Sequence, residues 1–479
     1  MHYDIIVIGA GLGGLTAGAK LAKEGRKVLL IEQHDRPGGC ATTFRRHDFT
    51  FEVGLHEMDG LDARDMKTKI FRDLGVFDHV EFLKVPEFYH FVHGSGQFTM
   101  PHDAEQAIKE LVGAFPQEEA GIRAYFDQLL NARKKLKESE GQPERTVGEF
   151  LDSMIGDDNL KLVLLGNLGY FHDDPYSLSL SYYSIAQGSY FQGGGNFIKG
   201  GSQMLSDYLA SVITANGGEV LLNHEVTGIM VDGDMVTGVR YRPAKKDHES
   251  LLTAYGREII ANAALPNVAN VLLPEETGKP LAEQIADLPA GASLLTLYLG
   301  FSKELKEIGS RYYSTFFYDE SVKSLADIRE NNGGPFSRRS FTFVDYSQVD
   351  SALAPAGKSV GVVCCIDYLH DWDNLSPAEY KAKKEEVARI FIGKLEEFLP
   401  GITDLIEYYE VGTAKTVARY TRNPEGAVYG FAQTPYRTTR PIPQTLSNLH
   451  FASAWTKTGG GFSGAIYSGY LCAMGIMRK

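Results

Sequence analysis

The first residues with a recognisable chemistry are three glycines near the start of the chain. Gly9, Gly11 and Gly14 fit the pattern GxGxxG, which permits a tight turn, a close approach of backbone to a pyrophosphate, and close packing of a helix on a strand. Glu32 follows eighteen positions after Gly14, where a carboxylate accepts hydrogen bonds from the hydroxyls of an adenosine ribose and disfavours a 2′-phosphate. The spacing predicts a site for an adenosine dinucleotide without that phosphate.

The elements needed to hold this motif surround it. The apolar run YDIIVIGAG predicts a buried parallel strand, a helix is expected from about Leu12 to Glu24, and RKVLLIE predicts a second strand. Such a βαβ unit is the context in which a glycine motif binds a dinucleotide. Beyond the acid, Gly38 and Gly39 form a second glycine pair that can bring backbone close to the pyrophosphate and the start of a flavin. This pair favours FAD over NAD.

On these motifs the chain resembles the flavin amine-oxidase superfamily and, within it, the group of phytoene desaturases, carotenoid isomerases and retinol saturases. Members of that group share GxGxxG, an acid, a GG pair and an aromatic–acid–x–Gly turn, which here is FEVG at 51–54. The stretches GGC and GLHEMDG look closest to the retinol saturases. Three later stretches also match the family: IKGGSQMLSDYLASVITANGGEVLLNHEVTGI, KTVARYTRNPEGAVYGF and FASAWTKTGGGFSGAIYSGYLCA. The resemblance implies an FAD-dependent oxidoreductase.

The resemblance also implies where the cofactor lies. It places Gly54, Leu55 and His56 close to the flavin ring, and it places Glu225 and Val226 beside the adenine, with Val226 contributing its backbone. The cofactor-binding residues implied in this way are Gly9, Ala10, Gly11, Leu12, Gly13, Gly14, Glu32, Gln33, Gly38, Gly39, Cys40, Ala41, Gly54, Leu55, His56, Glu225, Val226, Trp455, Gly460, Gly461 and Phe462.

Two details of the implied flavin site concern charge. Glycines 459–461 would begin a helix whose N-terminus faces the flavin and stabilises negative charge on it. Cys40 stands where many members of the superfamily have an arginine, so the role of that arginine is unfilled or has moved, with Arg45 and Arg46 as the candidates.

No catalytic residue is assigned from the sequence. His56, Glu57 and Lys457 are the polar residues that the resemblance places near the flavin ring, and each could either position a proton or only hydrogen-bond the flavin. We expect the second role for all three, which leaves them as weak candidates.

The middle of the chain contains the segment that suits a substrate. Residues 175–197 include no charged side chain and are rich in Tyr, Phe, Ser and Gly, a composition that fits a long apolar ligand and equally an aromatic core. The resembled group acts on polyenes and related lipids. We therefore expect an FAD-dependent enzyme that acts on C=C bonds of a polyene or long-chain lipid, by desaturation, saturation or cis–trans isomerisation. A flavin amine oxidase and a non-catalytic flavin-binding protein are the alternatives.

Several other classes of function are disfavoured. The net charge of −13 and the lack of a prominent basic run argue against nucleic acid as a partner. No HExxH motif and no Cys/His ligand spacing occurs, so no metal is expected. The GKSVG stretch at 357–361 matches GxSxG but precedes an apolar strand, opposite to a nucleophile elbow. Four cysteines without a CxxC pair indicate reduced thiols: Cys40, Cys364, Cys365 and Cys472.

The expected location is cytoplasmic, with peripheral contact to a membrane as a hypothesis because the substrate is a lipid. The start of the chain reads as a strand rather than a signal peptide. Residues 458–477 are uncharged, but six of the twenty are glycine, so a buried helix is expected there rather than a membrane span. The oligomeric state is not predicted.

Both ends of the chain predict strand–glycine–helix units, whereas the middle differs. We predict an α/β fold in which a Rossmann-like FAD-binding domain is built from the discontinuous segments 1–80, 198–290 and 415–479. An α+β substrate domain, formed by 81–197 and 291–414, is inserted into it. Within the insert, residues 103–165 are expected to be helical, strands are expected at about 293–301, 340–346 and 359–368, and a long helix at about 377–399.

Overall fold

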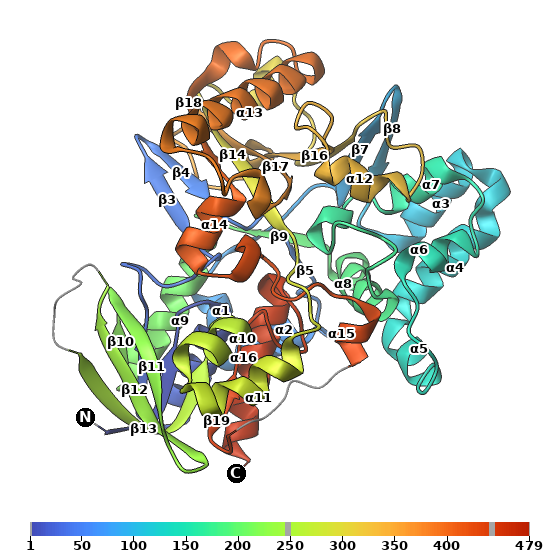
Figure 1. Cartoon of the computed structure of the whole chain (residues 1–479). Coiled ribbons are helices and arrows are strands. Elements are labelled where there is room, and N and C mark those ends of the chain that lie inside the picture. Colours follow the sequence, from blue (N-terminus) through green and yellow to red (C-terminus); the bar gives the residue numbers. More distant parts are fainter. Residues whose placement is uncertain (1, 245–250, 440–445, 479) are drawn as a thin grey trace.

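The computed structural model describes residues 2–244, 251–439 and 446–478, which form two sheets with helices packed around them (Figure 1). The first sheet has the strand order β10-β2-β1-β13-β12-β11, with β19 paired to β13. Strands β10, β2, β1, β13 and β19 are parallel, while β12 and β11 continue the sheet in antiparallel pairing. The bounds are β1 His2–Ile8, β2 Val28–Ile31, β10 Glu219–Leu221, β11 His224–Asp232, β12 Met235–Pro243, β13 Leu252–Ala261 and β19 Leu449–Phe451.

Helices from both ends of the chain pack on this first sheet. Helix α1 lies between α9 and α16, and the contact with α16 is close enough that a Cβ atom on Gly469 would lie 2.1 Å from the carbonyl oxygen of Gly13. The discontinuous, Rossmann-like construction predicted from the sequence is therefore confirmed. The helices of this part are α1 Leu12–Lys23, α2 Met66–Leu74, α9 Gln203–Ala215, α10 Leu265–Asn267, α11 Glu275–Ile285 and α16 Gly461–Met477.

The second sheet has the order β18-β14-β17-β16-β15-β7-β8 and is mostly antiparallel. The long helix α13 packs on it through an apolar cluster that includes Phe391 and Leu395. The strands and the helix predicted between 293 and 399 are confirmed. The bounds are β7 Tyr89–His93, β8 Gly96–Met100, β14 Ser293–Phe301, β15 Ser314–Tyr318, β16 Phe341–Asp345, β17 Ser359–Asp367, β18 Ile406–Gly412, α12 Asp327–Gly333, α13 Pro377–Phe398 and α14 Ala414–Thr421.

A helical region lies beside the second sheet, as residues 103–165 predicted, and α5 is at its outer tip in Figure 1. Its helices are α3 Ala104–Ala114, α4 Glu119–Leu130, α5 Ala132–Glu138, α6 Val147–Asp152, α7 Asp158–Leu164 and α8 Leu180–Gly193. The remaining elements are β3 Thr43–Arg46, β4 Phe49–Glu52, β5 Met58–Asp59, β6 Phe82–Lys84, β9 Gly195–Ile198 and α15 Pro435–Thr439. The domain boundaries given above stay a prediction.

The uncharged stretch near the end of the chain is not a membrane span. It forms α16, whose residues Ile466, Gly469 and Ala473 are buried against the rest of the protein. Within the described ranges, no helix combines the length and the apolar character needed to cross a bilayer.

Candidate cofactor site and cavity

The two glycine motifs lie against each other at the C-terminal ends of β1 and β2. The amide of Gly38 donates a hydrogen bond of 2.7 Å to the carbonyl of Ala10, and Gly11 and Gly38 form a parallel bridge. Helix α1 begins after Gly11, and no side chain caps its first turn. Its first amide groups are thus left without intrahelical acceptors, which is the arrangement that binds phosphate groups.

The glycines of the first motif are required by close approaches of backbone. Gly9 has a φ of +93°, a Cβ atom on Gly13 would lie 2.2 Å from the carbonyl oxygen of Ala452, and one on Gly14 would lie 2.2 Å from that of Gly9. The turn leaves no room for side chains between β1 and α1. These residues therefore fit the diphosphate of a dinucleotide.

Glu32 lies at the end of β2 and is buried, with 6% of its surface exposed. Its carboxylate accepts hydrogen bonds from the amides of Ala10 at 2.7 Å and His34 at 2.9 Å, which fixes it beside the first glycine turn. The amide of His224 donates to the carbonyl of Glu32 at 2.9 Å, and this bond places the start of β11 next to it. Val226, two residues along β11, is therefore near the ribose acid, as the family match implies.

Three of the predicted cofactor residues also have contacts within the protein. The carboxylate of Glu225 pairs with Arg422 and Arg242. Trp455 packs edge-on against Phe431 in the apolar core. Gln33 donates a hydrogen bond to the carbonyl of Tyr420. Their contact with the cofactor stays a prediction.

The cysteine that replaces the family's arginine is uncharged. Burial raises the pKa of the Cys40 thiol to about 11, so it stays protonated at neutral pH. Arg46 on β3 pairs with Glu410 at 2.9 Å, and neither Arg45 nor Arg46 lines the cavity described next. The structure offers no support for a transfer of the arginine's role to these two residues.

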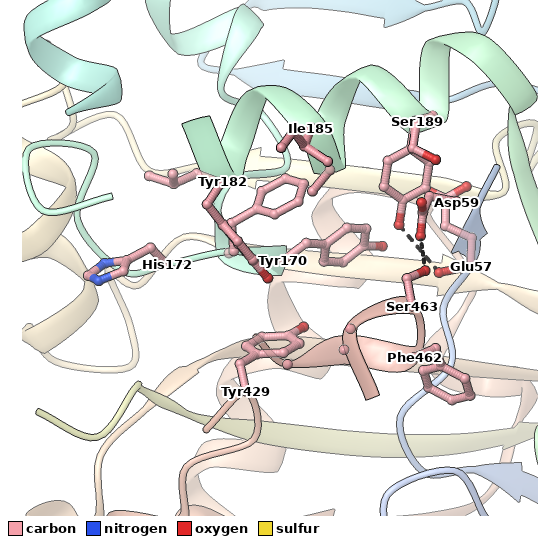
Figure 2. Close-up of a pocket in the computed structure, with 18 of the residues that line it drawn as sticks. Glu57, Asp59, Tyr170, His172, Tyr182, Ile185, Ser189, Tyr429, Phe462 and Ser463 are labelled. Atoms are coloured by element: carbon pink, nitrogen blue, oxygen red, sulfur yellow. Dashed lines mark hydrogen bonds between the residues drawn. The ribbon is translucent and has the colours of Figure 1, made fainter. Parts of the chain in front are cut away.

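A cavity of about 790 Å³ lies where the second sheet, α8 and the start of α16 come together (Figure 2). Figure 2 shows the rings of Tyr170, Tyr182 and Tyr429 around its centre, with Glu57, Asp59 and Ser463 gathered at one side. Predicted site residues that line it are Gly54, His56, Glu57, Lys457, Gly460, Gly461 and Phe462. Outside the lining are Gly9, Ala10, Gly11, Leu12, Gly13, Gly14, Glu32, Gln33, Gly38, Gly39, Cys40, Ala41, Leu55, Glu225, Val226 and Trp455.

The segment after the FEVG turn is held from one side by a buried carboxylate. Glu52 accepts hydrogen bonds from the amides of Gly54 and Leu55 at 3.1 and 3.0 Å, and from both the amide and the hydroxyl of Ser202 at 2.7 Å. Burial raises the pKa of Glu52 above its ordinary value, while these hydrogen bonds favour the ionised form and oppose that rise. The acid of the family turn is therefore a structural brace.

Three tyrosine hydroxyls hold the same segment from the other side. Tyr346 donates to the carbonyl of Leu55 at 2.9 Å, Tyr313 to that of His56 at 2.5 Å, and Tyr190 to that of Glu57 at 3.4 Å. These tyrosines come from α8 and from loops of the second sheet, far away in the sequence. Sequence reasoning missed them; the high tyrosine content of residues 175–197 was a signal for Tyr190, and no signal marked Tyr313 or Tyr346.

Two carboxyl groups on this segment have opposite surroundings. Asp59 pairs with the fully buried ammonium of Lys67 at 2.9 Å and accepts a hydrogen bond from Ser463 at the start of α16. Burial opposes the charge on Lys67, but Asp59, Tyr467 and Asp65 outweigh it and raise the pKa of Lys67. Glu57 is 7% exposed, and neither of its oxygens has a hydrogen-bond partner among the described residues.

His56 and Lys457, the other two weak candidates, differ in environment. His56 faces the cavity and contacts the hydroxyl of Tyr170 at 3.2 Å. Desolvation there lowers the pKa of His56 to about 4, so its imidazole is neutral at pH 7. Lys457 is exposed at the rim of the cavity. The three candidates thus do not form one cluster.

Comparison with known proteins identifies the family. The family model of flavin containing amine oxidoreductases matches residues 12–477. The chain belongs to that family. It is 26% identical over 510 residues to the chloroplastic prolycopene isomerase of Arabidopsis thaliana, covering 98% of this chain and 82% of the relative. It is 25% identical over 524 residues to the all-trans-retinol 13,14-reductase of Danio rerio, covering 95% and 84%.

Solved structures show the same fold. An oxidoreductase from Methanosarcina mazei matches with a TM-score of 0.68 and 17% identity, and both chains are covered completely. A putrescine oxidase variant matches with a TM-score of 0.67 and 15% identity, covering 100% of this chain and 99% of the other. Together with the family, these matches confirm the predicted α/β fold, the oxidoreductase class and FAD as the cofactor. When bound, FAD supplies hydride or electron transfer.

Proposed function

We propose that this flavoenzyme acts on the C=C bonds of a polyene or another long-chain unsaturated lipid, by saturation, desaturation or cis–trans isomerisation. The observation that carries the proposal is the cavity: its volume of about 790 Å³ lies in the range of ligand pockets, and uncharged residues of α8 line it beside Gly460 and Gly461. The printed names of the relatives, an isomerase of prolycopene and a reductase of retinol, support the same class of substrate.

We propose that the chain holds FAD along the line from Glu32 to the start of α16. The carboxylate of Glu32 would bind the ribose, and the amides at the start of α1 would bind the diphosphate. The turn around Gly54 and the start of α16 at Gly461 would then meet the flavin, since both line the cavity. Glu52 and the three tyrosine hydroxyls keep that turn in place.

The test is purification followed by visible spectroscopy, mass spectrometry of bound lipid, and turnover assays. We expect a bound flavin spectrum, an apolar lipid that co-purifies, and conversion of a conjugated polyene when the flavin is reduced. A coloured protein that carries no lipid and converts neither carotenoid nor retinoid would overturn the proposed substrate class. A colourless protein that takes up no FAD would contradict the family assignment itself.

An amine oxidase is the second candidate, because aromatic rings surround the cavity next to two acidic side chains. Tyr170, Tyr182 and Tyr429 line it together with Glu57 and Asp59, and aromatic faces and carboxylates both attract cationic amines. Adding primary amines to the oxidised enzyme distinguishes the two. Bleaching of the flavin spectrum by an amine, with no response to polyenes, would select this second function.

Peripheral membrane contact is proposed at the rim of the cavity. The exposed cations Arg64, Arg133, Lys134 and Lys457 line it, although the whole chain carries a net charge of −13. Helix α5 is a short basic run, ARKKLKE, that the sequence survey did not single out. The apolar side chains Leu136 and Ile185, exposed by 42% and 36%, stand in the same rim. This pattern fits an anionic bilayer from which a lipid would enter the cavity.

Sedimentation with vesicles tests this contact. Each cation near an anionic membrane contributes about 1 kcal/mol, so reversing two charges in R133E/K134E should weaken binding to phosphatidylglycerol-containing vesicles at least about tenfold. K303E/K306E, which changes the same charge at exposed positions outside the cavity lining, serves as the control. Equal binding of the two variants, or equal binding of the wild type to pure phosphatidylcholine, would contradict the proposal.

A further inference from the structure

Among the acidic residues that line the cavity, Glu57 is the buried one for which the described part of the chain supplies no cation and no hydrogen-bond donor. Asp59, two residues away, is paired with Lys67, and Asp65 is bound by the same ammonium at 2.8 Å. Asp62 stands at the rim, where water reaches it. Glu57 is buried and lines the cavity, yet both of its carboxyl oxygens lack a hydrogen-bond partner in the described part of the chain. An ionised carboxylate in such a place would be strongly unfavourable.

The position of this carboxyl group is built into the fold. A Cβ atom on Gly195 would lie 1.9 Å from Oε2 of Glu57, so the glycine at the start of β9 leaves space for the carboxyl group in its present position. The backbone of Glu57 is held by the hydroxyl of Tyr190, as described above. The side chain is thus packed into a fitted space between β9 and the cavity.

The charges around Glu57 favour its neutral form. Burial raises the pKa of Glu57 well above its ordinary value, and the carboxylates of Glu87 and Asp59 raise it further. Cations among the lining residues stand only at the exposed rim. Besides these two carboxylates, the titratable groups that feel the charge of Glu57 are the buried hydroxyls of Tyr170, Tyr190 and Tyr313.

We propose that Glu57 is the proton donor of this cavity, a neutral carboxylic acid that passes its proton to a carbon of the bound double bond. The inference rests on the proposed function. A reaction that adds to a C=C bond requires a proton, and Glu57 is the residue that would supply it. A buried acid beside an ionised, paired one is the arrangement by which proteins separate the roles of two carboxyl groups.

The step balances without a further reagent. The O–H bond of Glu57 breaks, the π electron pair of the double bond forms a C–H bond, and the positive charge spreads along the remaining conjugated chain. Glu57 is then a carboxylate, which together with the faces of Tyr170, Tyr182 and Tyr429 stabilises that cation. Rotation about the former double bond and return of the proton to Glu57 complete a cis–trans isomerisation with no net redox change.

Infrared difference spectroscopy tests the protonation state directly. The spectrum of the holoprotein at pH 7 should contain a carbonyl stretch of a neutral carboxylic acid that is lost in Glu57→Gln. The matched control is Glu410→Gln, which removes a carboxyl group that pairs with Arg46 and lies outside the cavity lining. That variant should keep the band. A wild-type spectrum from which E57Q removes no such band overturns the proposal, whatever the enzyme converts.

Deuterium exchange tests the transfer. A conjugated polyene incubated with the enzyme in D₂O should acquire deuterium at chain carbons, and E57Q should slow this incorporation about 100-fold or more while its flavin spectrum stays unchanged. Undiminished incorporation in E57Q, or an equal loss in E410Q, overturns the proposal and leaves the proposed function intact. If the wild type converts and labels no polyene while the infrared band is present, the proposed function has failed and the proton transfer falls with it.

Discussion

At the dinucleotide end of the site the protein uses backbone, whereas at the cavity end it uses side chains from distant segments. Glycines between β1 and α1 leave only amides and carbonyls within reach of a ligand, and Glu32 is the one acidic side chain fixed directly to that turn among the described residues. The cavity instead depends on Tyr190, Tyr313 and Tyr346 to hold one short segment. The backbone groups of the first end suit the diphosphate that all dinucleotides share. The side chains of the cavity end surround the region that we propose for the substrate.

The largest effect should follow from disturbing the backbone end. In Gly13→Ala the new methyl group would lie 2.2 Å from the carbonyl of Ala452, so the turn must open or the protein must misfold. We expect the purified variant to lose nearly all of its bound FAD, measured from the flavin absorbance per protein. Gly113→Ala in α3, where a Cβ meets nothing within 4 Å, is the control and should bind FAD normally. Full FAD occupancy in G13A would contradict the proposed binding of the diphosphate at this turn.

Next comes the buried ion pair at the cavity end. Lys67→Met removes the cation that faces Asp59 and Asp65 and leaves two carboxylates without a countercharge, although each keeps a hydrogen bond from a hydroxyl group. Breaking a buried pair from one side costs about 3–5 kcal/mol, so the urea midpoint should fall markedly. Lys199→Met, which breaks surface pairs with Asp350 and Glu81, should change stability little. Similar urea midpoints for the two variants would show that the ion pairs of Lys67 with Asp59 and Asp65 do not stabilise the protein.

Glu57 should behave in the opposite way to Lys67, because holding its carboxyl group in the neutral form costs stability at neutral pH and glutamine removes that cost. Its folded pKa is raised above the unfolded value, so the wild type loses stability as the pH rises above that unfolded pKa. Glu57→Gln should therefore be more stable than the wild type at pH 7.5, with the difference shrinking towards pH 4.5. Urea unfolding at the two pH values measures it. A difference that does not vary with pH would mean that Glu57 ionises normally.

The smallest effect should come from one hydroxyl. Tyr346→Phe leaves the buried carbonyl of Leu55 without its donor, which costs about 1–3 kcal/mol. Tyr429→Phe removes a hydroxyl for which no partner occurs among the described residues, and it should be nearly neutral for stability. Thermal unfolding of the two variants gives the comparison. Equal melting temperatures would show that the hydroxyl of Tyr346 does not stabilise the segment that contains Leu55.

The difference between the two ends also explains what the sequence could predict. Gly9 to Gly38 lie within thirty residues, and their spacing indicates both the turn and the ribose acid. Glu57 meets Gly195, and Asp59 meets Ser463, across gaps of more than a hundred residues. No local sequence pattern indicates that residues so far apart in the chain are in contact. The sequence therefore predicted the cofactor and the fold, and named Glu57 only as a weak candidate expected to bind flavin.

The predicted cofactor contacts of Trp455 and Glu225 stay predictions, and each side chain also has a partner from a distant segment. Trp455 packs against Phe431 in the apolar core. Glu225 carries a charge that Arg422 satisfies, and the arginine comes from a segment almost two hundred residues later. A motif specifies the path of the backbone better than the direction of a side chain.

The packing of α16 against α1 has a consequence for the order of events during synthesis. The glycine turn leaves the ribosome before Ala452 and Gly469, which close over it. At about 5–20 residues per second, translation of the intervening segment takes about 20–90 seconds. The nascent chain therefore exposes its phosphate-binding turn before the residues that cover the turn have been made. We expect a ribosome-bound chain that stops before β19 to retain FAD less well than the whole chain.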